Sequence, residues 1–181
     1  MTYTRSTWNF QQPNSKQLDL FIAQFVDQAI KTSTNSILAG GYVTPFYRYP
    51  NKQELKNKDI NTNCIITTQH DQDTQALYPD PSISQNKNLA YWIRPYVINA
   101  TVDNIVNNLD MSEQIIEIRD ELVDLLCFNN GEYTNSGTST ETFKNRPLHN
   151  TLLEERIFWE DTTNRPSHYY VTLTILFTIY Q

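Results

Sequence analysis

The stretch from His168 to Tyr180 constrains the fold of this chain more than any other part of the sequence. Apolar and polar side chains alternate along it, and Leu176 alone breaks the pattern. One face carries Tyr169, Val171, Leu173, Ile175, Phe177 and Ile179, and the other carries His168, Tyr170, Thr172, Thr174, Thr178 and Tyr180. A period of two is typical of a half-buried β-strand. At about 3.4 Å per residue this strand would span roughly 40 Å, so we expect part of it to serve a contact outside the subunit's own sheet.

Two segments have the spacing of amphipathic helices. The first, at about residues 15 to 32, follows a capping-box pattern formed by Asn14 and Gln17. Its apolar positions are Leu18, Phe21, Ile22, Phe25, Val26, Ala29 and Ile30. The second starts at Asp110 and is predicted to end at Asn129–Gly131, with a stripe of Ile115, Ile118, Leu122, Leu125 and Leu126.

The remaining apolar segments predict strands. They are residues 42–49, where Pro45 favours an edge strand, 63–69, 89–98 and 151–160. Residues 101–109 are interpreted as a short helical turn, and 70–88 and 132–150 as long polar loops. The order helix, strand, strand, strand, helix, strand, strand predicts an α+β fold, with two amphipathic helices on a mixed or antiparallel sheet. We expect an N-terminal arm over residues 1–13 and a single domain over 14–181.

Composition limits the classes of partner. The 181 residues suit one domain, and 14 Lys and Arg against 20 Asp and Glu give a net charge of −6. An acidic chain lacks the basic footprint expected of a protein that grips nucleic acid or an anionic membrane. The sequence shows no signal peptide and no apolar run of membrane-spanning length, so we expect a soluble protein. Cys64 and Cys127, each in an apolar run, are predicted to be buried thiols.

Motif chemistry is sparse. Four glycines leave no room for a phosphate-binding or dinucleotide-binding loop, and HExxH, CxxC and GxSxG are absent. His70, Asp71 and Asp73 could bind a cation, but they provide too few ligands for a dedicated site. For His149 or His168 to activate a nucleophile, the fold would have to bring a Ser or Cys to it. The acidic pairs at 154–155 and 160–161 are more simply the solvent-exposed face and the turn of a hairpin. We therefore expect no catalytic residue, no metal and no cofactor.

The order of elements carries one resemblance. It comprises an opening helix (Leu18 to Ile30), central strands around Cys64–Ile66 and Tyr91–Ile93, the helix Met111 to Leu126, and the closing Tyr169–Ile175. Over most of residues 14–181 this arrangement resembles the tail terminator (tail completion) proteins of long-tailed bacteriophages. The resemblance is architectural, because this family has no invariant short motif. The arm and the loop from Glu132 to Asn150 exceed the compact family pattern.

The resemblance implies a structural virion protein and not an enzyme. Such a protein forms a ring, typically of six subunits, at the head-proximal end of the tail, where it stops tail-tube polymerisation and meets the head connector. The implied partners are other copies of the chain, the tail-tube protein and a connector or neck protein, with DNA passing through the bore unbound, no membrane, and assembly in the host cytoplasm. A closed ring needs two different surfaces per subunit. The expected interface residues are Trp8, Phe10, Tyr78, Asp80, Tyr133, Phe143, Thr172, Thr174, Thr178 and Tyr180.

Three other hypotheses stay open at this point. The chain could be another phage neck or tail structural protein. It could instead be a monomeric module that binds a small ligand or carbohydrate on a platform of Trp92, Tyr96 and Trp159. A hydrolase would use His70 with Asp71 or Asp73.

Overall fold

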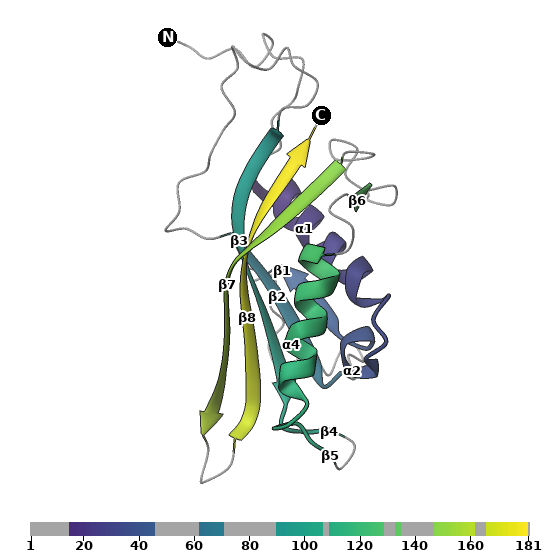
Figure 1. Ribbon diagram of the computed structural model, residues 1–181, viewed down its shortest axis with the longest axis vertical. Coiled ribbons are helices and arrows are strands. Elements are labelled where there is room, and N and C mark those ends of the chain that lie inside the picture. The colour runs from purple at the N-terminus through teal and green to yellow at the C-terminus, as the bar shows by residue number, and fades with distance from the viewer. Residues whose placement is uncertain are drawn as a thin grey trace.

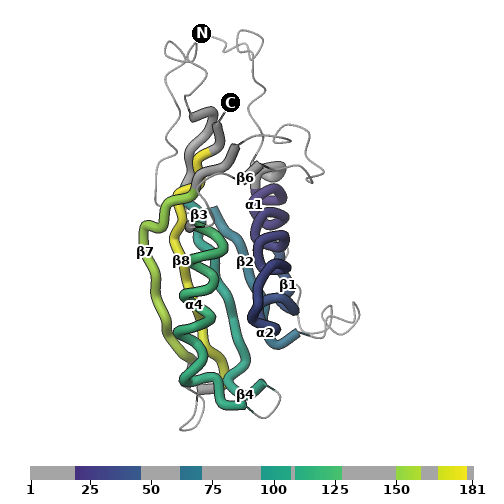
Figure 2. Tube along the Cα trace, turned by 45° about the vertical axis from the view of Figure 1, so that its right-hand side comes forward, coloured from purple at the N-terminus to yellow at the C-terminus, as the bar shows by residue number. Residues whose placement is uncertain are grey.

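The computed structural model describes residues 15–45, 62–70, 90–106, 109–128, 133–134, 147–161 and 166–180. It has an α+β fold in which the helices lie against one face of a sheet (Figures 1 and 2). The sheet has the order β1-β2-β3-β8-β7-β6. Its strands are β1 (Tyr42–Pro45), β2 (Cys64–His70), β3 (Ala90–Asp103), β6 (Tyr133–Thr134), β7 (Pro147–Asp161) and β8 (Pro166–Tyr180). The β1–β2 pair is parallel and the other pairs are antiparallel, so the predicted fold class is confirmed, with a mixed sheet.

Strand β8 lies in the middle of the sheet. It pairs with β3 on one side and with β7 on the other over almost its whole length. The predicted alternation is confirmed, since Tyr169, Val171, Leu173, Ile175 and Phe177 are all buried. The strand's length is therefore used within the subunit's own sheet, and its backbone is not available for the outside contact that we expected.

The two main helices cover the two ends of the sheet. Helix α1 (Ser15–Ile30) contacts β1 and β2, whereas α4 (Ile115–Val123) contacts β7 and β8. Between them lies an aromatic cluster, in which the Phe177 ring meets Phe25 and Tyr96 edge-on, with ring centroids 5.8 and 5.9 Å apart. The Tyr96 ring is fully buried, and its hydroxyl donates to Asp19 Oδ1 at 2.6 Å. This hydrogen bond offsets the cost of burying the hydroxyl.

Two expected boundaries are wrong. The described part of the segment 101–109 forms no helical turn, because β3 continues to Asp103 and the short strands β4 (Ile105–Val106) and β5 (Leu109–Asp110) pair with each other. Val102 and Val106 are buried there, and β-branched residues favour the extended backbone. The second helix starts at Ile115, because Asp110 Oδ1 accepts from Ser112 N at 2.9 Å and holds a turn before it.

The polar segment 132–150 also contains more structure than expected. It includes β6, and β7 begins at Pro147, where Leu148 already pairs with Ile179 of β8. Proline has no N–H to donate to a neighbouring strand, and this loss is tolerated at the first residue of a strand. Because β7 pairs with the long C-terminal strand, it begins at an earlier residue than the polar composition of that segment suggests.

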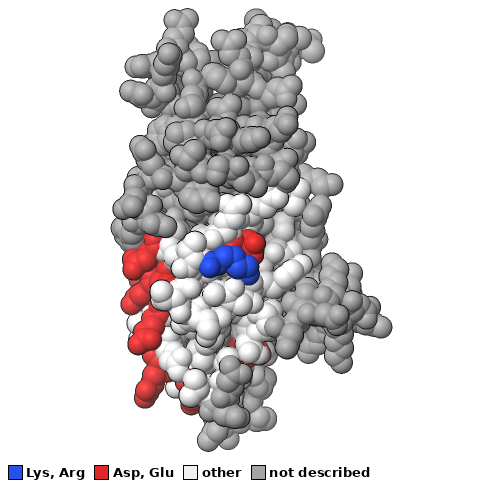
Figure 3. Space-filling model, turned by 90° about the vertical axis from the view of Figure 1, so that its right-hand side faces the viewer, with Lys and Arg blue, Asp and Glu red and all other residues white. Residues whose placement is uncertain are grey.

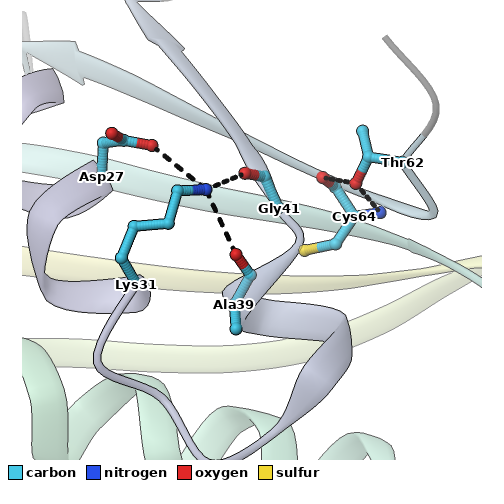
Figure 4. Close-up of polar contacts among 6 residues, drawn as sticks. All are labelled: Asp27, Lys31, Ala39, Gly41, Thr62 and Cys64. Carbon is cyan, nitrogen blue, oxygen red and sulfur yellow. Dashed lines mark hydrogen bonds and ion pairs between the residues drawn. The ribbon is translucent and has the colours of Figure 1, made fainter.

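Lys31 fixes the position of β1 at the edge of the sheet (Figure 4). Its Nζ donates to the carbonyls of Ala39 and Gly41, at 3.2 and 3.1 Å, and lies 3.6 Å from Asp27 Oδ1. These contacts join the end of α1 to α2 (Ser36–Ala39) and to the start of β1. A Cβ on Gly41 would lie 2.9 Å from the Leu38 carbonyl oxygen, so a side chain does not fit at this turn.

Glu121 ties the turn after α1 to α4. Its Oε1 accepts from Ser33 Oγ at 2.5 Å, from Thr34 N at 2.9 Å and from Asn35 N at 3.4 Å. Burial raises the pKa of Glu121, but the hydrogen bonds from this turn outweigh burial and leave the pKa below its ordinary value. The ionised carboxylate therefore stabilises the packing of the two helices.

We predict that Glu121→Gln lowers the free energy of unfolding by about 1 kcal/mol at neutral pH, because the charge of the acceptor is lost. A lowered pKa in the folded state gives stability that is complete above the unfolded-state pKa and is lost as the pH falls through the folded-state pKa. The difference between the two proteins should therefore disappear in acid. Denaturant unfolding from pH 7 to pH 3 measures it. Glu117→Gln, on the exposed side of α4, is the control, and an equal pH dependence in both variants would contradict the prediction.

Asn150 joins the end of the second helix to the sheet. Helix α4 continues as a π-helical turn, η3 (Asp124–Phe128), and the Leu126 carbonyl in it accepts from Asn150 Nδ2 at 2.7 Å. Both side chains are buried. A buried carbonyl without a donor costs roughly 1–3 kcal/mol.

We predict that Asn150→Ala lowers the free energy of unfolding by about that amount, roughly 1–3 kcal/mol, because the Leu126 carbonyl loses its donor. Thr151→Ala, at the neighbouring exposed position of β7, should change it by less than about 0.5 kcal/mol. Urea unfolding of the two variants measures the difference. Equal losses would mean that the hydrogen bond does not hold the helix end.

Candidate functional site

Strand β7 presents an open edge. Among the described strands, β6 alone lies on its outer side, and it pairs with Pro147 and Leu148. From Thr151 to Asp161 the outer backbone groups of β7 face no described strand. An open edge of this length is a template for pairing with another chain, which proteins usually protect.

Large apolar side chains are exposed along this edge. Leu153 is 53% exposed and Trp159 is 59% exposed, and Phe158 stacks on Tyr170 with ring centroids 4.9 Å apart. Leu153 falls where the register shifts between Leu152 and Glu154, so it has no partner in β8. Exposed aromatic and aliphatic side chains beside a strand edge are typical of surfaces that contact another molecule.

An acidic stripe borders the edge. Exposed carboxylates recur at helical spacing from the turn before α4, through α4, to the start of η3, at Glu113, Glu117, Asp120 and Asp124. Arg119 links this helix to the edge, with Nη1 3.2 Å from Glu155 Oε1 and Nη2 2.6 Å from Asp120 Oδ1. Figure 3 shows the acidic side chains along the margin of the helical face. The open edge of β7, its exposed apolar side chains and this stripe are together called the β7 flank.

One polar cluster has the connectivity of a nucleophilic triad. Ser167 Oγ lies 3.0 Å from His168 Nδ1, and His168 Nε2 lies 3.1 Å from Asp103 Oδ1. The fold forms it by pairing His168 of β8 with Asp103 of β3, a contact that local sequence patterns do not reveal. The His168 and Asp103 side chains are 40% and 44% exposed, whereas a triad acts in a site that excludes water and supplies oxyanion donors. We assign the cluster to joining the ends of the two strands.

The other candidate reactive groups lie apart from this cluster. His70 packs edge-on against Tyr96, with ring centroids 5.7 Å apart, and Asp71 and Asp73 lie outside the described residues. The cysteines are free and buried as predicted, and burial raises the pKa of Cys64 and of Cys127 to about 12. They are protonated and unreactive at neutral pH. The described residues contain no group of three side chains that could hold a metal ion.

The expected interface residues are only partly placed. Trp8, Phe10, Tyr78, Asp80 and Phe143 lie outside the described residues, as do the side chains of Tyr133 and Tyr180. Thr172 and Thr174 are half-buried on the sheet face away from the helices, and Thr178 is buried. Thr172 Oγ1 donates to Asn99 Oδ1 at 3.2 Å, so it also has a role within the sheet.

Sequence reasoning missed the β7 edge. The available signal was the apolar run Ile157, Phe158 and Trp159, which breaks the alternation expected of a strand with one wet face. Two residues of the proposed ligand platform lie apart, and the side chain of the third, Trp92, is outside the described residues. Tyr96 is fully buried under the helices, whereas Trp159 is exposed, and their partners on β8, Ile175 and Tyr169, are about 20 Å apart at the rise of a strand.

No known family model matches this chain, and no curated protein is significantly similar to it in sequence. In the described part of the chain, no helix is both long enough and apolar enough to cross a membrane.

We predict that a fluorophosphonate, which labels activated serines, leaves Ser167 unmodified, because the exposed His168 cannot activate it as a shielded histidine would. After treatment with the reagent, intact mass measurement should show no mass increase in the wild type or in Ser167→Ala. Labelling of the wild type that disappears in the variant would identify a nucleophile and contradict our assignment.

Proposed function

We propose that this protein is a structural component of a phage virion, which forms a ring at the head-proximal end of the tail. There it ends tail-tube polymerisation and joins the tail to the head connector. The observation that supports this most is the β7 flank, where the edge of β7 pairs with no described strand beyond Leu148 and three large apolar side chains, Leu153, Phe158 and Trp159, are exposed. The α+β order of elements, which resembles that of the tail terminator proteins, supports a role of this surface in assembly.

The two ends of the sheet suit a ring. A closed ring of one kind of subunit needs two different surfaces that fit each other. Among the described strands the sheet ends in two unlike edges: the short β1 at one end, and at the other end the long β7, of which the two-residue β6 covers only Pro147 and Leu148. A subunit with two unlike edges that fit each other can join its neighbours head to tail. A subunit with a single edge that pairs with its own copy forms only a dimer.

The charge of the chain suits the bore of such a ring. DNA that passes through must not be held, and contacts from Lys and Arg to phosphates would hold it through counterion release. The net charge of −6 and the acidic stripe avoid such contacts. In this proposal the partners are the tail-tube protein and a connector or neck protein, and assembly takes place in the host cytoplasm. Another neck or tail role would use the same surfaces.

Native mass spectrometry, with and without magnesium, tests the ring. We predict a hexamer of about 127 kDa in place of the 21.2 kDa subunit. Added to polymerising tail-tube protein, the ring should stop elongation and shorten the tubes seen by electron microscopy. A protein that stays monomeric alone and with tubes, and leaves the length of the tubes unchanged, would contradict the proposal.

A further inference from the structure

We infer that neighbouring subunits of the ring join through their sheets, with β7 of one copy pairing antiparallel to β1 of the next. This inference rests on the proposed ring and identifies the two surfaces that close it. Beyond Leu148 no described strand pairs with the outer edge of β7, and none lies on the outer side of β1, the strand at the other end of the sheet.

Strand directions fit this pairing. From β1 to β7, the neighbours are paired parallel, antiparallel, antiparallel and antiparallel, so β1 and β7 run in opposite directions. A neighbour placed head to tail keeps its own strand directions. Its β1 therefore meets β7 in the antiparallel sense, which allows short, direct hydrogen bonds between the backbones.

The helices fit as well. Both main helices lie on the same face of the sheet, α1 at the β1 end and α4 at the β7 end (Figure 2). Pairing of the two edges would place α1 of one copy beside α4 of the next, over a continuous sheet. The side chains of Tyr42 and Val43, which are half-buried at the β1 edge, would then cover Phe158 and Trp159 on β7.

Charge favours this occupant over a second β7. Two copies of β7 paired with each other, with their helices on the same face, would bring both acidic stripes together, whereas Glu154 and Glu155 already pair with Arg156 and Arg119. Strand β1 carries no charged residue, and the nearby Lys31 is an exposed cation paired with Asp27. The β1 edge therefore accepts an acidic neighbour without repulsion.

Two matched double variants test the β7 edge. Leu153→Lys with Trp159→Lys places charges on it, whereas Ile105→Lys with Leu109→Lys places them on the β4–β5 hairpin. The four side chains are almost equally exposed, at 53%, 59%, 59% and 54%, so both variants should fold. We expect the first to lose the hexamer and give the 21.2 kDa monomer, and the second to keep the hexamer.

A mixing experiment tests the β1 edge. Tyr42→Glu should also be monomeric, because its carboxylate faces the acidic β7 flank. Mixed with the Leu153→Lys/Trp159→Lys variant, it still offers an intact β7 to an intact β1, so we expect a dimer of about 42 kDa. A dimer formed by Tyr42→Glu alone would show β7 pairing with β7 and would overturn the inference.

The outcomes separate this inference from the proposed ring. A wild type that never forms a ring, even on tail tubes, contradicts the proposed function. A wild-type ring that survives the β7 substitutions, or is lost with the hairpin substitutions instead, overturns the edge pairing and leaves the ring standing. A wild-type ring with no dimer in the mixture also overturns it.

Discussion

The structure depends on the pairing of β8 with both β3 and β7. This three-stranded centre supplies the apolar face on which the helices pack, and the buried residues Tyr169 to Phe177 run down its middle. A central strand with a long buried face can accept helices at both ends of the sheet. The aromatic contacts of Phe177 with Phe25 and Tyr96 show how directly the first helix relies on this strand.

Elements with strong periodicity could be predicted from the sequence. The first helix and the last strand were found nearly to the residue, because their apolar positions recur without interruption. The boundaries around residues 101–115 and 147–150 were missed, because long-range strand pairing determines the secondary structure there. Leu148 is in a strand because Ile179 lies opposite it, and nothing in its local sequence shows that.

The surface was harder to predict than the core. The β7 flank exists because no described strand pairs with most of the outer edge of β7. That depends on the order of strands in the sheet, which could not be predicted from the sequence. The contact of His168 with Asp103 is likewise a product of register between distant strands. Tyr96 looked like a polar platform residue, but its hydroxyl is satisfied by Asp19 inside the protein. Side-chain chemistry alone does not distinguish these cases.

The central position of β8 also sets the order of events during synthesis. Strands β3 and β7 lie on either side of a strand that follows both of them in the chain, so the sheet cannot close until residues 166–180 have left the ribosome. Pairing between strands that are distant in the sequence is slow, because the chain loses the entropy of loop closure before the stabilising contacts form. Until then β3 and β7 cannot be joined in one sheet, so the apolar face on which both main helices pack stays incomplete.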